Sequence, residues 1–176
     1  GVEVRAGGWG PLLGDEGSGY ALGLQGLRAV FRARDGWGVP TRLSADLLAQ
    51  LGLEAWDELI GPLYAGSVGR ERIAALAPAV LSAAAGGDQA AAAIVAREGR
   101  CLGRQVAAVA GRLGLRGAIP VAGAGGILSD GEGLWRPLMA SACRGGALLE
   151  RRAALLPPVL GAALLAWHSC GRPVGA

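Results

Sequence analysis

The pattern of apolar and polar positions predicts a chain built mostly of helices. Residues 1–6 alternate between apolar and charged types and predict a strand. Apolar residues then recur at helical spacing from Ser18 to about Arg34, which predicts an amphipathic helix with Ser18 as its N-cap. The apolar stripe of this helix comprises Tyr20, Leu24, Leu27 and Phe31.

Shorter helices are expected in the next part of the chain. Ser44 is in a position to cap a short helix, and residues 54–64 form another. Residues 70–85 carry one apolar stripe, which Pro78 should kink or divide because proline cannot donate a backbone hydrogen bond. We interpret residues 41–85 as a helical insertion.

Longer apolar patterns follow. Asp88 is expected to cap a helix that ends near Leu113, and two further helices are expected at residues 132–143 and 157–170. The stripe of the first comprises Leu102, Val106, Val109 and Leu113. The apolar tract at residues 153–167 is too short to span a bilayer and contains two prolines, so we expect a buried helix there and no membrane partner.

Two strands complete the pattern, and the fold class is therefore α/β. Residues 117–122 are short and apolar and predict an internal strand, while residues 146–153 form a second candidate. The first strand runs directly into the glycine-rich residues 123–126. Open α/β sheets bind ligands at the carboxyl ends of their strands, so this loop is a candidate binding site.

Composition and charge disfavour several functional classes. The 176 residues suffice for one large domain, and the net charge of +3 is spread along the chain without a basic run, which disfavours nucleic-acid binding. The three cysteines, Cys101, Cys143 and Cys170, are far apart, so neither a disulfide framework nor a zinc site is indicated. A reducing, cytoplasmic location fits this usage.

The most informative segment is the glycine-rich loop at residues 7–19. Glycine loses the most backbone entropy on ordering and supplies no side chain to a core, so such a loop is shaped to approach a ligand. Trp9 offers a flat apolar face, and Asp15 and Glu16 offer acceptors for hydroxyl groups. Together these groups suggest a sugar, although the two carboxylates could instead complement the start of the following helix.

The second glycine loop lacks the pattern of a dinucleotide-binding site. Leu128 stands where the third glycine of that fingerprint is required, and no acidic residue follows at the needed distance. Two readings stay open: a simple tight turn, or a loop in which Gly125, Gly126 and Ser129 contact an adenosine. His168, the only histidine, is expected to be a core or surface residue without a catalytic role.

Taken together, these motifs resemble a known family. Residues 7–10 and 14–19, followed by residues 73–78 and then by residues 120–129, resemble the carboxyl-terminal lobe of the N-acetylglucosamine kinase family. That family belongs to the BadF/BadG/BcrA/BcrD-type ATPases of the actin, Hsp70 and sugar-kinase superfamily. The resemblance covers nearly the whole chain, and we interpret residues 1–176 as this carboxyl-terminal lobe.

The resemblance implies a helix-rich, RNase-H-like lobe with a small sheet that is incomplete at its amino-terminal end. It further implies ATP-dependent phosphorylation, with Mg²⁺, of the 6-hydroxyl of an amino sugar, first of all N-acetylglucosamine. The sugar-binding residues that it implies are Gly8, Trp9, Gly10 and Asp15. The adenosine-binding residues are Gly125, Gly126 and Ser129.

The family's phosphate loops and its general base lie upstream of these motifs and do not occur in this sequence. We therefore expect the chain to be inactive alone, to need a missing amino-terminal lobe as partner, and to form a homodimer. The resemblance assigns no catalytic residue and no metal ligand to this chain. The alternatives are a glucosamine kinase of the same family and a non-catalytic sugar sensor. The dehydratase-activating branch of the family is disfavoured, because Cys101 and Cys143 do not match its cluster ligands.

Overall fold

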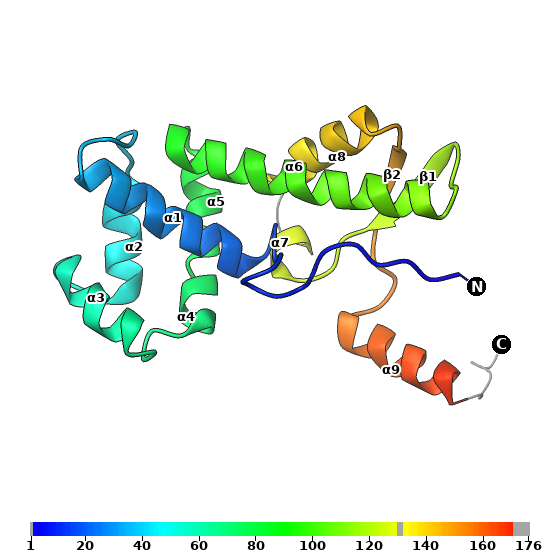
Figure 1. The fold of residues 1–176 in the computed structure, drawn as a ribbon, viewed down its shortest axis with the longest axis horizontal. Coiled ribbons are helices and arrows are strands. Elements are labelled where there is room, and N and C mark those ends of the chain that lie inside the picture. Colours follow the sequence, from blue (N-terminus) through cyan, green and yellow to red (C-terminus); the bar gives the residue numbers. More distant parts are fainter. Residues whose placement is uncertain (1, 130–131, 171–176) are drawn as a thin grey trace.

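The computed structural model describes residues 2–129 and 132–170, apart from the side chains of Ser129 and His168. Helices dominate this part of the chain (Figure 1). Its elements are α1 (Gly19–Arg34), α2 (Leu43–Leu51), α3 (Asp57–Tyr64), α4 (Arg70–Ala74), α5 (Ala77–Ala85), α6 (Gln89–Arg112), β1 (Ala118–Ala122), α7 (Gly126–Ser129), α8 (Trp135–Arg144), β2 (Leu148–Arg152) and α9 (Pro158–Ser169).

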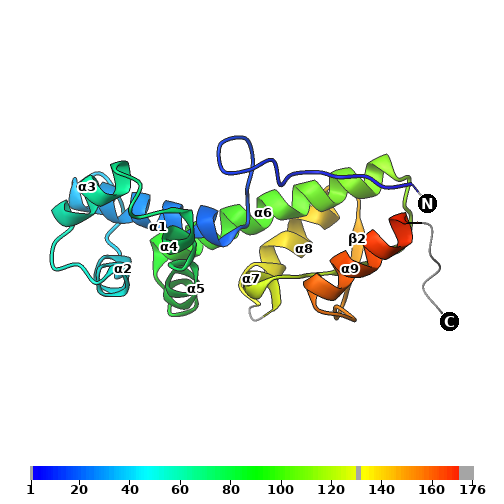
Figure 2. The ribbon, with the colours of Figure 1, turned by 90° about the horizontal axis from the view of Figure 1, so that it is seen from below.

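The long helix α6 joins two hydrophobic cores. At one end of the molecule its first turns pack with α1 to α5 around a cluster that includes Leu22, Leu47 and Val80. At the other end its later turns pack with α8, β1 and β2 around Leu138 and Leu149. Figure 2 shows the amino-terminal segment and α8 on opposite sides of α6, so this helix separates two faces of the molecule.

The sheet contains two parallel strands, which confirms the α/β class. β1 pairs with β2 from Ala118 opposite Leu148 to Ala122 opposite Arg152, and α7 and α8 form the crossover between the strands. The expectation that β1 is an internal strand is wrong. Only Ile119 and Val121 are partly buried, because no described element pairs with the other edge of β1.

Local sequence signals fixed several helix ends correctly. Ser18 caps α1, and its Oγ accepts a hydrogen bond of 3.0 Å from the amide of Ala21. Helices α4 and α5 are separate, and Pro78 stands in the first turn of α5, so the division near this residue is confirmed. Ser44 is not a cap, because it lies inside α2 and its Oγ accepts from Trp56 Nε1 at 3.1 Å.

The buried face of α1 differs from the predicted stripe. Its fully buried side chains are Leu22, Leu27 and Val30, whereas Tyr20, Leu24 and Phe31 are only partly buried. The reason is the close approach of α4 and α5 to two glycines. A side chain at Gly23 would overlap the carbonyl of Ile73, and one at Gly26 would lie 2.8 Å from a methyl of Val80. The helix therefore turns its glycine face inward.

Two expectations about the ends of the chain are wrong. Residues 2–6 form no strand, because no described strand runs beside them; the carbonyl of Arg5 instead accepts from Arg112 at 2.9 Å. Helix α9 is not buried, since the side chains of Leu165 and Trp167 are 67% and 48% exposed. No described element covers it, and it stands apart from the other helices (Figure 1).

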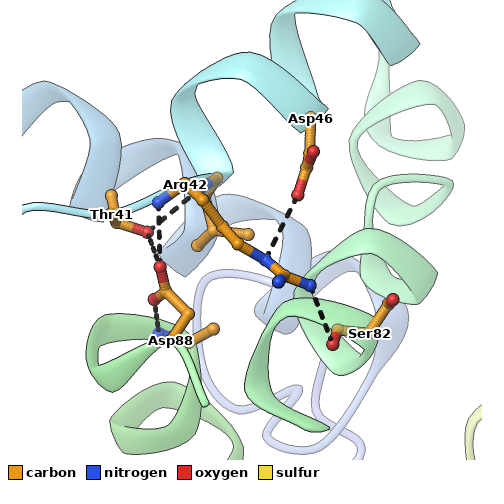
Figure 3. A network of polar contacts seen from close by, with 7 residues as sticks. Thr41, Arg42, Asp46, Ser82 and Asp88 are labelled. Carbon is orange, nitrogen blue, oxygen red and sulfur yellow. Dashed lines mark hydrogen bonds and ion pairs between the residues drawn. The ribbon is translucent and has the colours of Figure 1, made fainter. Parts of the chain in front are cut away.

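Asp88 ties Thr41 and Arg42, just before α2, to the start of α6 (Figure 3). Its Oδ1 caps α6 by accepting from Ala91 at 2.9 Å, while Oδ2 accepts from the Thr41 hydroxyl at 2.9 Å and from the Arg42 amide at 2.8 Å. Partial burial alone would raise the pKa of this carboxyl, but these hydrogen bonds outweigh burial, and the net pKa of Asp88 is lowered. The charged form therefore holds the loop before α2 against the start of α6.

Candidate functional site

The glycine-rich loop at residues 7–19 adopts backbone conformations that only glycine takes readily. Gly7, Gly8, Gly10 and Gly17 have φ angles of 75°, 66°, 93° and 76°, in the left-handed region. The middle of the loop closes on itself, since the amide of Gly14 donates to the carbonyl of Gly10 at 2.8 Å. The sequence therefore specifies one tight backbone path here.

Helix α6 anchors this loop. The amide of Gly17 donates to Oε2 of Glu98 at 2.9 Å, and Glu98 is only 3% exposed. Seven residues further along α6, Gln105 Nε2 donates to Oε2 of Glu16 at 3.0 Å. Sequence reasoning did not find Glu98. The signal was present, because Glu98 is the one carboxylate on the buried face of α6, and a buried carboxylate needs a partner.

Trp9 stands out from the loop into solvent. Its side chain is 62% exposed, and the guanidinium of Arg5 lies over its ring at 4.6 Å from the ring centroid. Arg5 also donates from Nε to the carbonyl of Gly7 at 3.1 Å, which holds the guanidinium in place. Arg5 Nη2 donates to the carbonyl of Gly8, whereas a side chain at Gly10 would meet nothing within 4 Å. An exposed aromatic surface beside the open backbone of Gly10 is suited to stack against the apolar face of a sugar ring.

One carboxylate oxygen of Asp15 makes structural contacts, and the other accepts no hydrogen bond from the described residues. Its Oδ2 accepts from the Ser18 hydroxyl at 2.9 Å and from Arg70 Nη2 at 2.5 Å, so the carboxylate joins the start of α1 to α4. Its side chain is 18% exposed. Among the described residues none donates to Oδ1. The helix-end role is therefore real, but it leaves one oxygen available to a ligand.

The second glycine loop follows β1 and leads into α7. Gly125 has a φ of 88°, and a side chain at Gly125 or at Gly126 would meet nothing within 4 Å. The backbone is therefore open to close approach by a ligand at the carboxyl edge of the parallel strands. Ser129 is the last residue of α7, and its side chain lies outside the described part of the chain.

A hollow of about 660 Å³ lies at this edge of the sheet. Its lining residues are Gly123, Leu128, Glu132, Trp135, Arg151, Arg152, Ala153 and Ala154. Arg151 lies 4.5 Å from the ring centroid of Trp135 and pairs with the carboxylate of Glu132. Sequence reasoning did not find these polar groups, since they come from the end of β2, from the loop before α8 and from the start of α8.

Residues that flank the two glycine loops line one groove. A groove of about 340 Å³ runs between the amino-terminal segment, α6 and β1. Ala6, just before the first loop, lies on one wall, and Ala122 and Leu128, which bracket the second loop, lie on another. The groove is mostly apolar. Within residues 2–129 and 132–170, no three His, Cys, Asp or Glu side chains gather to hold a metal.

The fold of this chain resembles part of a solved structure. A crystal structure from Chromobacterium violaceum, described provisionally as an N-acetylglucosamine kinase, aligns with a TM-score of 0.65 and 30% identity. The alignment covers 91% of this chain and 50% of that one.

The chain belongs to the BadF/BadG/BcrA/BcrD ATPase family, whose model matches residues 1–166. It is 34% identical over 131 residues to an N-acetylmuramic acid/N-acetylglucosamine kinase of Clostridium acetobutylicum. This alignment covers 74% of this chain and 43% of that protein. It is 42% identical over 90 residues to an N-acetyl-D-glucosamine kinase of Dictyostelium discoideum, covering 51% and 28% respectively. The chain thus spans less than half the length of these curated relatives.

None of the helices in the described ranges is, taken singly, long and apolar enough to cross a membrane. Residues 70–85 and α6 together have the length and apolar composition of a membrane span, but the chain bends by 113° between them. Both contribute buried side chains to the first core, including Val80 and Val95.

Proposed function

We propose that this chain is the carboxyl-terminal lobe of an ATP-dependent amino-sugar kinase that phosphorylates the 6-hydroxyl of N-acetylglucosamine. Family membership and the names of the relatives support a sugar kinase. The observation that carries the proposal is the first glycine loop, in which an exposed Trp9 and a free oxygen of Asp15 flank bare backbone. Glucosamine and N-acetylmuramic acid are the neighbouring substrates to test.

In this proposal each loop has its own ligand. Gly8, Trp9 and Gly10 line the sugar site, and Asp15 Oδ1 accepts from sugar hydroxyls. Gly125, Gly126 and Ser129 contact the adenosine of ATP, beside the hollow at the strand ends. ATP supplies the transferred phosphoryl group and its Mg²⁺ neutralises charge. What this chain contributes is binding and orientation, since its described residues offer no metal-binding cluster.

A second lobe and a sheet of RNase-H type also belong to the proposal. The unpaired edge of β1, the apolar groove beside it and the exposed helix α9 are surfaces that such a lobe and its strands would cover. Phosphoryl transfer needs phosphate loops and a general base, so we expect the chain to be inactive without that lobe. A homodimer and a cytoplasmic location complete the assignment.

The test separates the ligand role of Asp15 from its structural role. In the intact protein, Asp15→Ala removes the contacts with Ser18 and Arg70 and also the free oxygen. Arg70→Gln removes the ion pair with Asp15 and the guanidinium over the Tyr20 ring but keeps the free oxygen. We expect Asp15→Ala to weaken N-acetylglucosamine binding at least about tenfold, as loss of a charge-assisted hydrogen bond does, while Arg70→Gln retains binding. Calorimetric titration of the sugar and a coupled assay of ATP-dependent phosphorylation measure both effects. Equal losses in the two variants would assign Asp15 a structural role only.

Trp9 has a matched control within the chain. Trp37 is also exposed, at 70%, and also lies under an arginine, Arg32, at 5.3 Å. We expect Trp9→Ala to raise the KM for the sugar and Trp37→Ala to leave it unchanged. If both variants bind the sugar like the unmodified protein, the glycine loop is not the sugar site, even if kinase activity is found.

A further inference from the structure

A concave surface outside both glycine loops lies between α5, α6 and α8. Its volume is about 890 Å³, within the range of about 300–1,000 Å³ typical of small-molecule sites. The α6 residues that line it include Val95, Ala96 and Arg100, whereas neither Glu98, which holds the first glycine loop, nor any residue of that loop is part of the lining. The cavity is therefore separate from the proposed sugar site.

One part of this cavity is apolar. Leu81 and Ala84 from α5 and Val95 and Ala96 from α6 form its walls, with Ala140 of α8 beside them. Gly133 lies over this part, and a side chain added there would touch both Leu81 and Val95, at 3.6 and 3.7 Å. A hydrocarbon group is the ligand chemistry that such a surface favours.

The other part of the cavity is basic. Arg100 of α6 and Arg144 of α8 line it, and both also line an adjoining hollow of about 340 Å³ together with Arg104, whereas Arg136 lines the cavity from the first turn of α8. Across residues 2–129 and 132–170, no carboxylate pairs with any of these four guanidinium groups. The nearest acidic group in the lining, Glu132, is paired with Arg151.

Stabilisation of helix ends explains only part of this cluster. Arg144 is in the last turn of α8, where a cation complements the helix dipole. Arg100 and Arg104 are in the middle of α6, where the dipole offers nothing. Unpaired arginines gathered at one end of an apolar cavity match an anionic group joined to a hydrocarbon chain.

We propose that this cavity binds a small anionic amphiphile, with its anionic head at Arg100 and Arg144 and its hydrocarbon chain against Leu81 and Val95. This inference does not depend on the proposed sugar phosphorylation. The site takes a free carboxylate or a phosphate head equally, since both accept from guanidinium groups.

Calorimetric titration of the intact protein with decanoate tests the proposal, with acetate and decanol as matched probes that carry only the head or only the chain. We expect saturable binding of decanoate and much weaker binding of both matched probes. Arg100→Gln combined with Arg144→Gln should weaken decanoate binding by at least about tenfold. Arg28→Gln, which removes an exposed arginine on α1, should leave it unchanged.

The apolar end has its own variant. Ala92 is exposed at the rim, and Ala92→Trp should fill the cavity and lower decanoate affinity without disturbing the core. Absence of saturable decanoate binding would overturn the proposal, as would equal binding of acetate, which means an adventitious ion only. Equal binding of decanol would refute the anionic head. Decanoate binding that none of the variants changes would place the ligand elsewhere.

Discussion

The contact between α6 and α8 allows a quantitative test of how this lobe is held together. A side chain at Gly103 of α6 would overlap the carbonyl of Leu138 and lie 2.6 Å from Cβ of Ser141. Both neighbours are on α8, and the carbonyl belongs to rigid helical backbone. Gly111, in the same helix, is exposed, and a side chain there would meet nothing within 4 Å. The two glycines therefore form a matched pair.

The magnitudes oppose each other at Gly103. Replacing a helical glycine by alanine gains up to about 1 kcal/mol of helix propensity, whereas an added methyl in a close-packed interface costs about 1–3 kcal/mol. The overlap with backbone favours the upper end of that cost. We expect Gly103→Ala to lower the free energy of unfolding by about 1–2 kcal/mol and Gly111→Ala to raise it by up to about 1 kcal/mol.

Urea denaturation followed by circular dichroism measures the difference. With an m-value of about 2 kcal/mol/M, the denaturation midpoints of the two variants should differ by about 0.5–1.5 M. Equal m-values are required, because a changed m-value would mean a changed unfolding reaction. If Gly103→Ala is as stable as Gly111→Ala, α8 does not pack against α6 as closely as described.

Two further predictions concern carboxylates. Asp88→Ala should lower stability by about 1–2 kcal/mol at neutral pH. Because folding lowers the pKa of Asp88, its contribution is present above an unfolded-state pKa of about 3.9 and is lost as the pH falls below it, so the gap between Asp88→Ala and the unmodified protein should close on acid titration of stability. Glu98→Ala should cost about 1–3 kcal/mol by leaving the Gly17 amide without an acceptor and should speed proteolysis of the glycine loop, while Glu98→Gln, which keeps an acceptor, should do neither. Equal proteolysis rates for the two Glu98 variants would contradict that anchoring role.

Features encoded in a few neighbouring residues were predictable from the sequence. Ser18 and Asp88 cap the helices that follow them, and the chain divides near Pro78, because capping and the loss of a proline amide act within one helical turn. The strand at residues 117–122 and its glycine loop were also predictable, since a short apolar run bounded by glycines has a strong local signature.

Features that depend on distant partners were not predictable. The inward face of α1 is set by Gly23 and Gly26. Glycine does not contribute to an apolar stripe in the sequence, but at these two positions it allows α4 and α5 to approach closely. The apolar tract in α9 predicted burial, and no described element covers it. At the candidate site, the loop residues were legible, but Glu98 is 81 positions from the amide it accepts from, a separation that no local pattern reports.

The anchoring of the glycine loop on α6 limits how the loop can adapt to ligands of different size. Glu98 holds the loop, and Gly103, five residues later and so about 7.5 Å further along the helix axis, holds α8. Contacts on both sides of this stretch of α6 therefore link the position of Gly17 to that of α8. If the proposed sugar site is correct, a change in ligand size is accommodated more readily by exchanging side chains at the rim of the loop, as at Trp9, than by moving the backbone at Gly17.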